Sequence, residues 1–422
     1  MKRVVVTGRG VVAPNGTGKT AFTKALVEGR SGITHLKDLE EKKFSCQVAG
    51  VCADVDTELG EYLASADISA MSQGMKFGAL AALEAYDEAG LERLADDASE
   101  PLFDTGAIIG TGIGGLDVFA DTVFPAVANK KVRRMGSAVV EQIMCSGPSA
   151  KIAGIFGLGN QVTANSSACS TGTEAIIMGA DRIREGKATR MLVGGVEAAH
   201  SHIWAGFDSM RVLSRKFNDT PEAASRPMSE SAAGFVPGSG AGVLVIEDLE
   251  SAQRRGATIF AEIVGSSINC GGMRAGGSMT APSALSVKRC IREALLAADC
   301  QPSDIDYING HLTATMADPI ELNNWHEALE LAPEKMPFVN STKSMIGHGL
   351  GAAGAMETVA TLLQMEKGFL HPSINCEDLH PKIEKFQDRI VRSKLNNSIN
   401  VAAKASFGFG DVNSCLIFKK WS

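Results

Sequence analysis

The strongest constraint on the fold is that the chain resembles itself. The run Asn165-Ser166-Ser167-Ala168-Cys169 opens a strand–turn–helix pattern, and Asn340-Ser341-Thr342-Lys343-Ser344 opens a second one at an offset of 175 residues. The helices that follow end near Gly186 and Gly368, at an offset of 182, so the second copy carries seven extra residues, among them His348. Phe235-Val236-Pro237-Gly238 matches Phe407-Gly408-Phe409-Gly410 at an offset of 172. Any α/β protein repeats strand–turn–helix units, but here the turn residues match as well, which favours a duplicated unit.

Strand-like and helix-like segments alternate along the chain. Apolar runs predict strands at 4–6, 107–109, 162–164, 191–193, 242–246, 260–264, 307–309, 338–340 and 415–418. Helical periodicity predicts helices at 76–89, 172–185, 286–298, 321–330 and 352–367. Apolar strands between helices predict a layered α/β fold with largely buried sheets. The duplication predicts two halves, residues 1–255 and 256–422.

Composition excludes several classes of protein. Hydrophobic residues make up 45% and charged residues 21% of the chain, which is typical of a globular protein. The net charge of -7 argues against nucleic-acid binding as the main role. No run of about 18 uncharged apolar residues occurs, so no membrane span is expected. The first residues enter a strand-like run rather than a signal-peptide pattern, and we expect a cytoplasmic protein.

Cysteine usage points to a reducing compartment. The nine cysteines are odd in number and form no Cys-x-x-Cys pair. A disulfide framework or a structural zinc site is therefore not expected, and most of the thiols should be inert and buried.

Three other motifs are better explained by structure than by chemistry. The segment 13–20 ends like a phosphate-binding loop, but Ala13 stands where its first glycine is needed. The glycines of 110–115 match a dinucleotide fingerprint without an acidic ribose ligand after a second strand, so we expect turn glycines at a packed interface. His200 and His202 have no third ligand in a spaced motif, so no metal site is predicted.

Cys169 is the best candidate nucleophile. It follows an apolar strand and precedes a helix, on a sharp turn where backbone N–H groups and the positive helix end favour a thiolate. A nucleophile elbow exposes a serine to substrate in the same way. Most cysteines on turns are structural, so this position alone does not establish catalysis.

Two histidines strengthen the case. His311 follows the strand at 307–309, and His348 lies in the glycine-rich turn of the second copy, at the place that corresponds to Cys169 in the first. Active sites of α/β proteins gather at such strand ends, and a pseudo-twofold duplication would bring the two turns together. One thiol and two imidazoles can carry out acyl transfer through a thioester.

With these motifs the chain resembles the β-ketoacyl-[acyl carrier protein] synthases of the elongating (type I/II) class, in the thiolase superfamily. The resemblance spans essentially residues 1–420. The motifs that carry it are Val5-Val6-Thr7-Gly8, Ser167-Ala168-Cys169-Ser170, Asn218-Asp219-Thr220-Pro221, Ala224-Ser225-Arg226-Pro227, His311-Leu312-Thr313, the segment 341–348 and Phe407-Gly408-Phe409-Gly410. A Cys-His-His set, rather than the Cys-His-Asn of initiating synthases or the Cys-His-Cys of thiolases, indicates the elongating branch. The resemblance implies a five-layer α-β-α-β-α sandwich.

The resemblance also implies a mechanism: decarboxylative condensation of an acyl chain, held on Cys169, with malonyl-[acyl carrier protein]. The N–H groups of Cys169 and Phe409 would form the oxyanion hole, and His311 and His348 would stabilise the enolate. The remaining implied roles are electrostatic support by Lys343, with a salt bridge to Glu357 as its structural alternative, pantetheine binding by Thr313 and Thr315, and an aromatic gate at Phe409. No metal or redox cofactor is implied.

The implied partner is an acidic acyl carrier protein. Two basic clusters are candidate docking sites, although such clusters are usually only solvated surface: Lys130, Lys131, Arg133 and Arg134, and then Arg211, Arg215 and Lys216. The helix near 64–72 lacks the basic residues that the family often uses. The resemblance further implies a homodimer in which the sheets of the first halves join.

Some residues depart from the family pattern. Leu312 stands where the family usually has Gly, Ala314 where it usually has Ser, and Asp411-Val412 where it usually has Gly-Thr. We expect these changes to crowd the pocket beside His311 and the gate loop and to add a charge there. They leave open a related ketosynthase of a specialised polyketide or polyene pathway, instead of fatty acid biosynthesis. A non-catalytic chain-length partner is a third alternative, against which the intact Cys169, His311 and His348 argue.

Overall fold

The computed structural model describes residues 1–95 and 97–421. Most of its strands join one mixed sheet that runs through the molecule. In chain order they are β1 (Val4–Ala13), β2 (Gly16–Thr17), β5 (Thr105–Gly110), β6 (Val162–Thr163), β7 (Arg190–Glu197), β8 (Gly240–Asp248), β9 (Ala261–Cys270), β10 (Tyr307–Asn309), β11 (Phe338–Asn340), β14 (Val401–Gly408) and β15 (Val412–Lys420). Two short hairpin sheets lie outside it: β3 (Ile33–His35) with β4 (Val48–Gly50), and β12 (Phe369–Leu370) with β13 (Leu395–Asn396).

The same strand order occurs twice in the large sheet. The first strand set lies in the order β6-β5-β7-β8-β1, and the second strand set in the order β11-β10-β14-β15-β9. In each set the first two neighbouring pairs are parallel and the last two are antiparallel. The sets meet where β1 pairs with β9, through Val5 with Glu262 and Val6 with Ala261. A duplicated α/β unit would produce this repetition.

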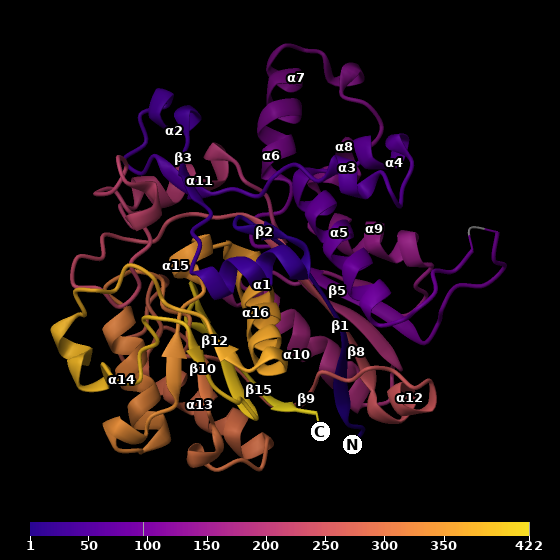
Figure 1. Ribbon diagram of the computed structural model, residues 1–422. Helices are drawn as coiled ribbons and strands as arrows, with labels where there is room; N and C mark the ends of the chain where they lie inside the picture. The colour runs from indigo at the N-terminus through magenta and orange to yellow at the C-terminus, as the bar shows by residue number, and fades with distance from the viewer. Residues whose placement is uncertain (96, 422) are drawn as a thin grey trace.

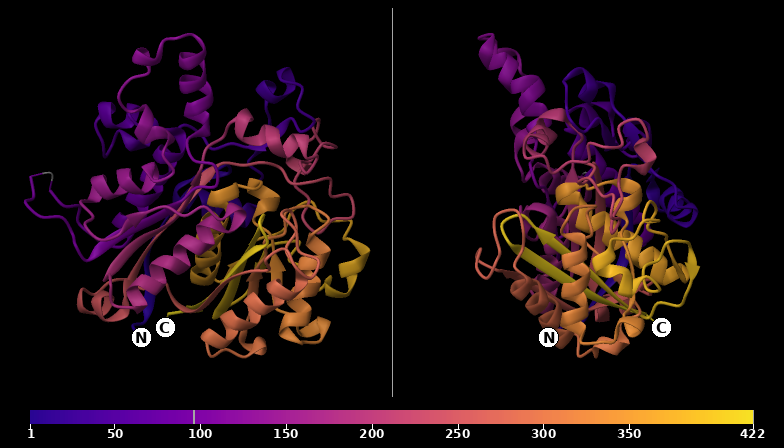
Figure 2. Two further views of the ribbon diagram at one scale, coloured as in Figure 1. Left: turned by 180° about the vertical axis from the view of Figure 1, so that it is seen from behind. Right: turned by 90° about the vertical axis from the view of Figure 1, so that its left-hand side faces the viewer.

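Helices fill the space between the two strand sets and cover their outer faces. α10 (Thr171–Arg184) and α16 (Ala353–Lys367) contact each other and strands of both sets. α5 (Gln73–Glu88) and α9 (Gly147–Phe156) cover the first set on its outer face, and α13 (Ala284–Ala297), with α14 (Asp318–Leu329) beside it, covers the second. Figures 1 and 2 show these outer helices, violet and orange, on opposite sides of the molecule. The layers therefore run α-β-α-β-α, as the resemblance implies.

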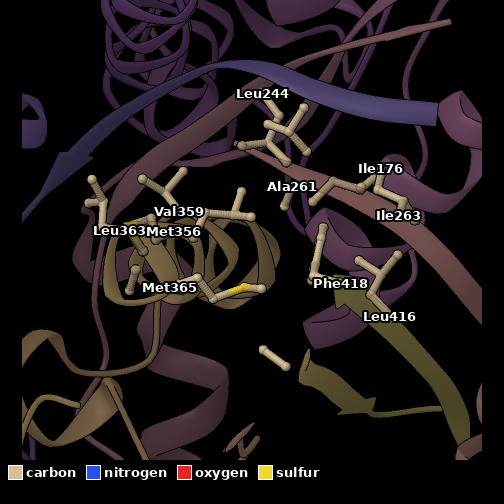
Figure 3. Close-up of a cluster of buried hydrophobic side chains, with 14 of the residues drawn as sticks. Ile176, Leu244, Ala261, Ile263, Met356, Val359, Leu363, Met365, Leu416 and Phe418 are labelled. Atoms are coloured by element: carbon tan, nitrogen blue, oxygen red, sulfur yellow. The ribbon is translucent and has the colours of Figure 1, made fainter. Parts of the chain in front are cut away.

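The central layer is held by a large apolar cluster. Ile176 of α10 and Met356, Val359 and Leu363 of α16 are buried in it, facing Leu244 of β8 and residues of β9 and β15 (Figure 3). All of these side chains are less than 3% exposed. Burial of aliphatic side chains contributes roughly 1.5–3 kcal/mol each, so this cluster is a main reason why the two sets stay in contact.

The expected segments coincide with observed elements, apart from shifts at their ends. No strand was expected at β14, whose eight residues are all buried although two of them, Lys404 and Ser406, are polar. The other helices are α1 (Gly18–Glu28), α2 (Lys37–Glu41), α3 (Asp56–Leu59), α4 (Ser65–Ser69), α8 (Val139–Ile143), α11 (Ser201–Ser209), α12 (Leu249–Arg254) and α15 (Lys343–Ile346).

One helical arm projects from the body. It consists of α6 (Leu116–Val118), the π-helical turn η1 (Phe119–Val123) and α7 (Phe124–Ala128), and it stands clear of the layers in Figures 1 and 2. Phe119 and Phe124 on this arm are 45% and 65% exposed. Among the described residues, none of the helices has the length and apolar character needed to cross a membrane.

Candidate active site

Cys169 lies on a tight turn between β6 and α10. The 3-10 turn η3 (Ala168–Ser170) contains it, and Ala168 has a left-handed φ of 49°, which is uncommon for a residue with a side chain. Thr171 holds the turn: its hydroxyl donates to the carbonyl of Ala168 at 2.7 Å and accepts from the N–H of Ser167 at 2.9 Å. The backbone N–H of Phe409 is near enough to the Cys169 sulfur to lower its pKa.

His311 is fixed through its backbone and its ring. The carboxylate of Glu321 accepts the N–H groups of His311 and Leu312 at 2.7 and 2.8 Å. The ammonium of Lys343 donates to the carbonyl of His311 at 2.7 Å and lies 3.5 Å from its Nδ1. Because an ammonium can only donate, Nδ1 is the accepting nitrogen, and in the neutral ring the proton is on Nε2.

His348 carries its proton on the same nitrogen. The N–H of Leu350, in the 3-10 turn η7 (Leu350–Ala352), donates to Nδ1 of His348 at 3.2 Å. The neutral ring therefore has its proton on Nε2, which lies 3.1 Å from the sulfur of Cys169. Both histidines thus offer an N–H donor from Nε2.

Thiol and imidazoles come together because the N-terminal ends of α10 and α16 cross closely. A Cβ on Gly172 would lie 2.7 Å from the backbone nitrogen of Ala355, so only glycine allows this approach. The two histidine rings have centroids 5.4 Å apart, and one donor atom from each of Cys169, His311 and His348 lies within 4.8 Å of the others. Three such atoms could hold a metal, but rings that present N–H groups suit an oxyanion better than a cation.

These side chains open onto one cavity of about 240 Å³. Its lining includes Cys169, His311, His348, Thr313, Thr315 and Phe409. The rest is largely apolar, with Phe207, Val212, Phe235 and Leu350 among the lining residues. A larger groove of about 670 Å³ beside the N-terminus is open to solvent and contains none of the candidate residues. The mostly apolar cavity at Cys169 is the one suited to an acyl chain.

Burial controls the protonation of the site. It raises the pKa of Cys169 to about 11, and the opposing effects of the Lys343 charge and the Phe409 N–H do not offset it. The sequence-based expectation of a favoured thiolate is therefore wrong for the free enzyme. Burial, followed by the charge of Lys343, holds the pKa of His311 and of His348 well below the usual range. Both rings are neutral at physiological pH.

Lys343 forms the salt bridge to Glu357 that the sequence suggested, and both side chains are buried. Sequence reasoning missed a second cation there, since Lys404 lies 3.0 Å from the other oxygen of the Glu357 carboxylate. It also missed Glu321 and Asp318, whose carboxylates bind the backbone of residues 311–315. Acidic residues shortly after the His311 motif were the available signal for these two.

Glu197, at the end of β7, was likewise not predicted. Its buried carboxylate accepts from the N–H groups of Gly112 and Gly351, both at 2.9 Å, and from the Thr111 hydroxyl at 3.1 Å. Burial raises its pKa to about 7. The glycine run at 110–115 is thus a turn held against the loop that follows His348, which agrees with the packed interface expected there.

Two of the departures from the family pattern, Leu312 and Asp411, do not act as expected. Leu312 is buried in the core beneath α13 and α14 and does not line the cavity. The Asp411 side chain is fully buried and faces residues 273–286, where it accepts from the N–H of Ser283 at 2.8 Å and of Met273 at 3.1 Å. It therefore adds no charge to the cavity, because its carboxylate is bonded elsewhere.

The candidate docking residues lie on the surface. Lys130, Lys131, Arg133 and Arg134 follow α7, within or beside the 3-10 turn η2 (Val132–Arg134), and are all exposed. Arg211 and Arg215, after α11, are exposed too. These positions leave the charges available to a partner.

Comparison with known proteins agrees with this geometry. Residues 1–252 match the family described as the N-terminal domain of beta-ketoacyl synthase, and residues 260–377 match its C-terminal domain. The 3-oxoacyl-[acyl-carrier-protein] synthase 2 of Vibrio harveyi is 35% identical over 427 residues, 99% of each chain. A beta-ketoacyl synthase from Burkholderia phymatum is similar over the full length of both chains, with a TM-score of 0.91 at 28% identity. A type II polyketide ketosynthase, solved in complex with its acyl-carrier protein, is also similar over the full length of both chains, with a TM-score of 0.87 at 29% sequence identity. The chain belongs to the beta-ketoacyl synthase family.

Proposed function

We propose that the protein is a 3-oxoacyl-[acyl carrier protein] synthase that extends fatty acyl chains by two carbons. One observation carries the proposal: the partly buried sulfur of Cys169 and two imidazole N–H groups face a single, mostly apolar cavity. In the first step the Cys169 thiol attacks the thioester of an acyl carrier protein. The acyl chain passes to sulfur, and the thiol proton leaves with the pantetheine thiol. The N–H groups of Cys169 and Phe409 stabilise the tetrahedral oxyanion.

The second step is decarboxylation of malonyl carrier protein. Its thioester oxygen accepts from the Nε2 protons of His311 and His348, and negative charge develops on that oxygen as carbon dioxide leaves. Preorganised donors in a buried site stabilise such charge strongly, because no water has to reorganise. Thr313 and Thr315, whose hydroxyls are 3.1 Å apart in the cavity lining, bind the pantetheine arm.

Condensation follows when the enolate carbon attacks the acyl thioester on Cys169. The new carbon–carbon bond forms as the sulfur leaves, and one proton from solvent restores the thiol. Lys343 keeps His311 in the donating tautomer through its contact with Nδ1. Removing one donor from such a site typically lowers the rate about a hundredfold to a thousandfold.

The substrate partner is an acyl carrier protein, which would dock on the exposed basic residues after α7 and α11. An acidic partner is steered by such charges at low ionic strength. The protein is proposed to be cytoplasmic, in line with nine free cysteines among the described residues. The boundary between the two halves is proposed near residue 255, after α12.

A homodimer is proposed through the first strand set. Its edge strand β6 is only half-buried, and an unpaired edge can pair with the same edge of a second copy. The exposed apolar side chains of the arm are a further surface that a second copy would cover, namely Phe119, Phe124 and Val127. Sedimentation that gives a monomer at micromolar concentration would contradict this.

The function is tested by incubating the protein with acyl carrier proteins of graded chain length and then with malonyl carrier protein. We expect an acyl mass increase on the Cys169 peptide, followed by release of carbon dioxide and of a chain two carbons longer. Cys169→Ala should abolish acylation, and Cys270→Ser, at an exposed thiol, serves as the matched control. Acylation confined to polyene-like chains would indicate a specialised pathway, and no acylation of the wild type would refute the proposal.

The histidines are tested by malonyl decarboxylation alone. His348→Ala should lower this rate by about a hundredfold or more, whereas His348→Gln, which keeps an N–H near the Nε2 position, should retain more of it. Equal rates for the two variants would mean that the N–H donor is not what matters.

A further inference from the structure

Lys404 is a buried cation that the mechanism above does not use. It lies in the middle of β14, and its side chain has no exposed surface. Burying an ammonium group is costly unless its charge is compensated and its protons are hydrogen-bonded. A hydrophobic residue in this buried strand would avoid that desolvation cost, which suggests that the charge of Lys404 has a role at this site.

The contacts of Lys404 lead directly to the histidines. Its ammonium lies 3.0 Å from Oε2 of Glu357, donates to the Ser406 hydroxyl at 3.2 Å and also bonds the carbonyl of Ala405. The other carboxylate oxygen of Glu357 binds Lys343, which in turn contacts the ring and the carbonyl of His311. One carboxylate therefore bridges two ammonium groups.

The charges in this region do not cancel within the bridge. Two lysines share Glu357, which leaves one positive charge in surroundings with no solvent exposure. Burial lowers the pKa of Lys404, and the charge of Glu357, followed by that of Glu321 in α14, opposes this effect and favours the ammonium. The thiol of Cys415 in β15 also faces Lys404, whose charge lowers the Cys415 pKa against the effect of burial. The charge of Lys404 also contributes to the lowered pKa of both His311 and His348.

We propose that Lys404 is a positioning residue for the condensation, which holds Glu357 and Lys343 in place and adds to the positive charge that opposes protonation of both histidines. This inference rests on the proposed function. Neutrality matters because a protonated ring would carry a proton on Nδ1, where the N–H of Leu350 and the ammonium of Lys343 already donate. Protonation would break these contacts and turn the rings away from the thioester oxygen.

The test compares pH profiles of malonyl-carrier decarboxylation for the wild type and the two neutral variants Lys404→Gln and Lys404→Met. Removing a positive charge raises the pKa of the nearby imidazoles, so activity should be lost at higher pH on the acid side. The acid limb of the profile is the range in which activity falls as the pH decreases. We expect the midpoint of this acid limb to move up by about one pH unit in both variants. Lys404→Arg, which keeps the charge, should return the limb toward the wild-type position.

A second readout separates the histidines from the thiol. The charges that act most on the pKa of Cys169 are those of Lys343, Glu357 and Glu197, so the pH profile of Cys169 alkylation should move much less than that of decarboxylation when Lys404 is changed. Arg190→Gln is the matched control, because Arg190 and Arg255 share the buried carboxylate of Glu247 just as the two lysines share Glu357. It should lower thermal stability and leave the acid limb unchanged.

Each outcome decides between the alternatives. An unchanged acid limb in a folded Lys404→Gln or Lys404→Met protein overturns the proposal, as does an equal shift in both pH profiles or the same shift in Arg190→Gln. If only one of the neutral variants folds, that variant decides. A wild-type protein that does not decarboxylate malonyl carrier protein would refute the proposed function instead.

Discussion

Asp411 is expected to lock the gate loop, defined as residues 407–411, to the neighbouring loop at 271–283. Its carboxylate accepts from the N–H groups of Ser283 and Met273 and, at 3.2 Å, from the Ser286 hydroxyl. The backbones are joined as well, by the Gly271 N–H to the Asp411 carbonyl at 3.0 Å and the Gly410 N–H to the Met279 carbonyl at 2.8 Å. Phe409, whose backbone N–H lowers the pKa of Cys169, lies within this gate loop.

The perturbation is Asp411→Asn. Asp411 has a left-handed φ of 61°, which asparagine also tolerates, so the backbone can stay as it is. The new amide group would face the Met273 N–H, donor against donor. Hydrogen bonds to a charged acceptor are worth about 1.5–3 kcal/mol, and losing about 2 kcal/mol should raise local opening roughly thirtyfold.

Hydrogen exchange measured by mass spectrometry provides the assay. Peptides covering 271–283 and the gate loop should exchange roughly thirtyfold faster in Asp411→Asn, and the rest of the chain should be unchanged. The control is Asp299→Asn, because Asp299 has a similar φ of 50° but is exposed. Unchanged protection at 271–283, or a loss spread over the whole chain, would refute the assigned role of this carboxylate.

Two further predictions concern buried acids. Because burial raises the pKa of Cys169 to about 11, its alkylation rate by iodoacetamide should still rise between pH 8 and about 10, and a plateau below pH 8 would contradict this. Glu197→Gln places a neutral amide where the folded state favours a neutral acid, so its effect on the unfolding free energy, measured in thermal or denaturant melts, should depend on pH. The pKa of Glu197 is raised from 4.5 to about 7, so the folded state holds the extra proton. The stability from this group is complete below pH 4.5 and is lost as pH rises through 7, and the Gln variant should lack this dependence.

Much of the fold could be predicted because its signals are local. The repeated turn residues at offsets near 175 anticipate two strand sets of the same order, and apolar periodicity gives the helices that separate them. The strand β14 was missed for a physical reason. Lys404 and Ser406 interrupt the apolar pattern of a fully buried strand. A buried lysine is tolerated only where the folded chain places a charged partner beside it, as it places Glu357 beside Lys404.

The site was predictable in its chemistry but not in its electrostatics. The residue types and turn positions of Cys169, His311 and His348 suffice to suggest thioester chemistry. Nothing local, however, reveals that burial outweighs the helix end at Cys169, or that Asp411 faces away from the cavity. Such effects depend on long-range packing and on which neighbour takes up each charge.

The duplication explains why the reactive geometry can stay constant while the substrate varies. Cys169 follows a strand of the first set, and the two histidines follow strands of the second. The distance between the sulfur and the imidazoles is fixed by a close backbone contact between the helices that follow, at Gly172 and Ala355. Main-chain contacts cannot be adjusted by choosing another rotamer, so the sulfur and the imidazoles are held rigidly. The apolar cavity lining, in contrast, consists of side chains such as Phe207 and Val212. These can change size without moving the reacting atoms, so selection for chain length can act on them independently of the chemistry.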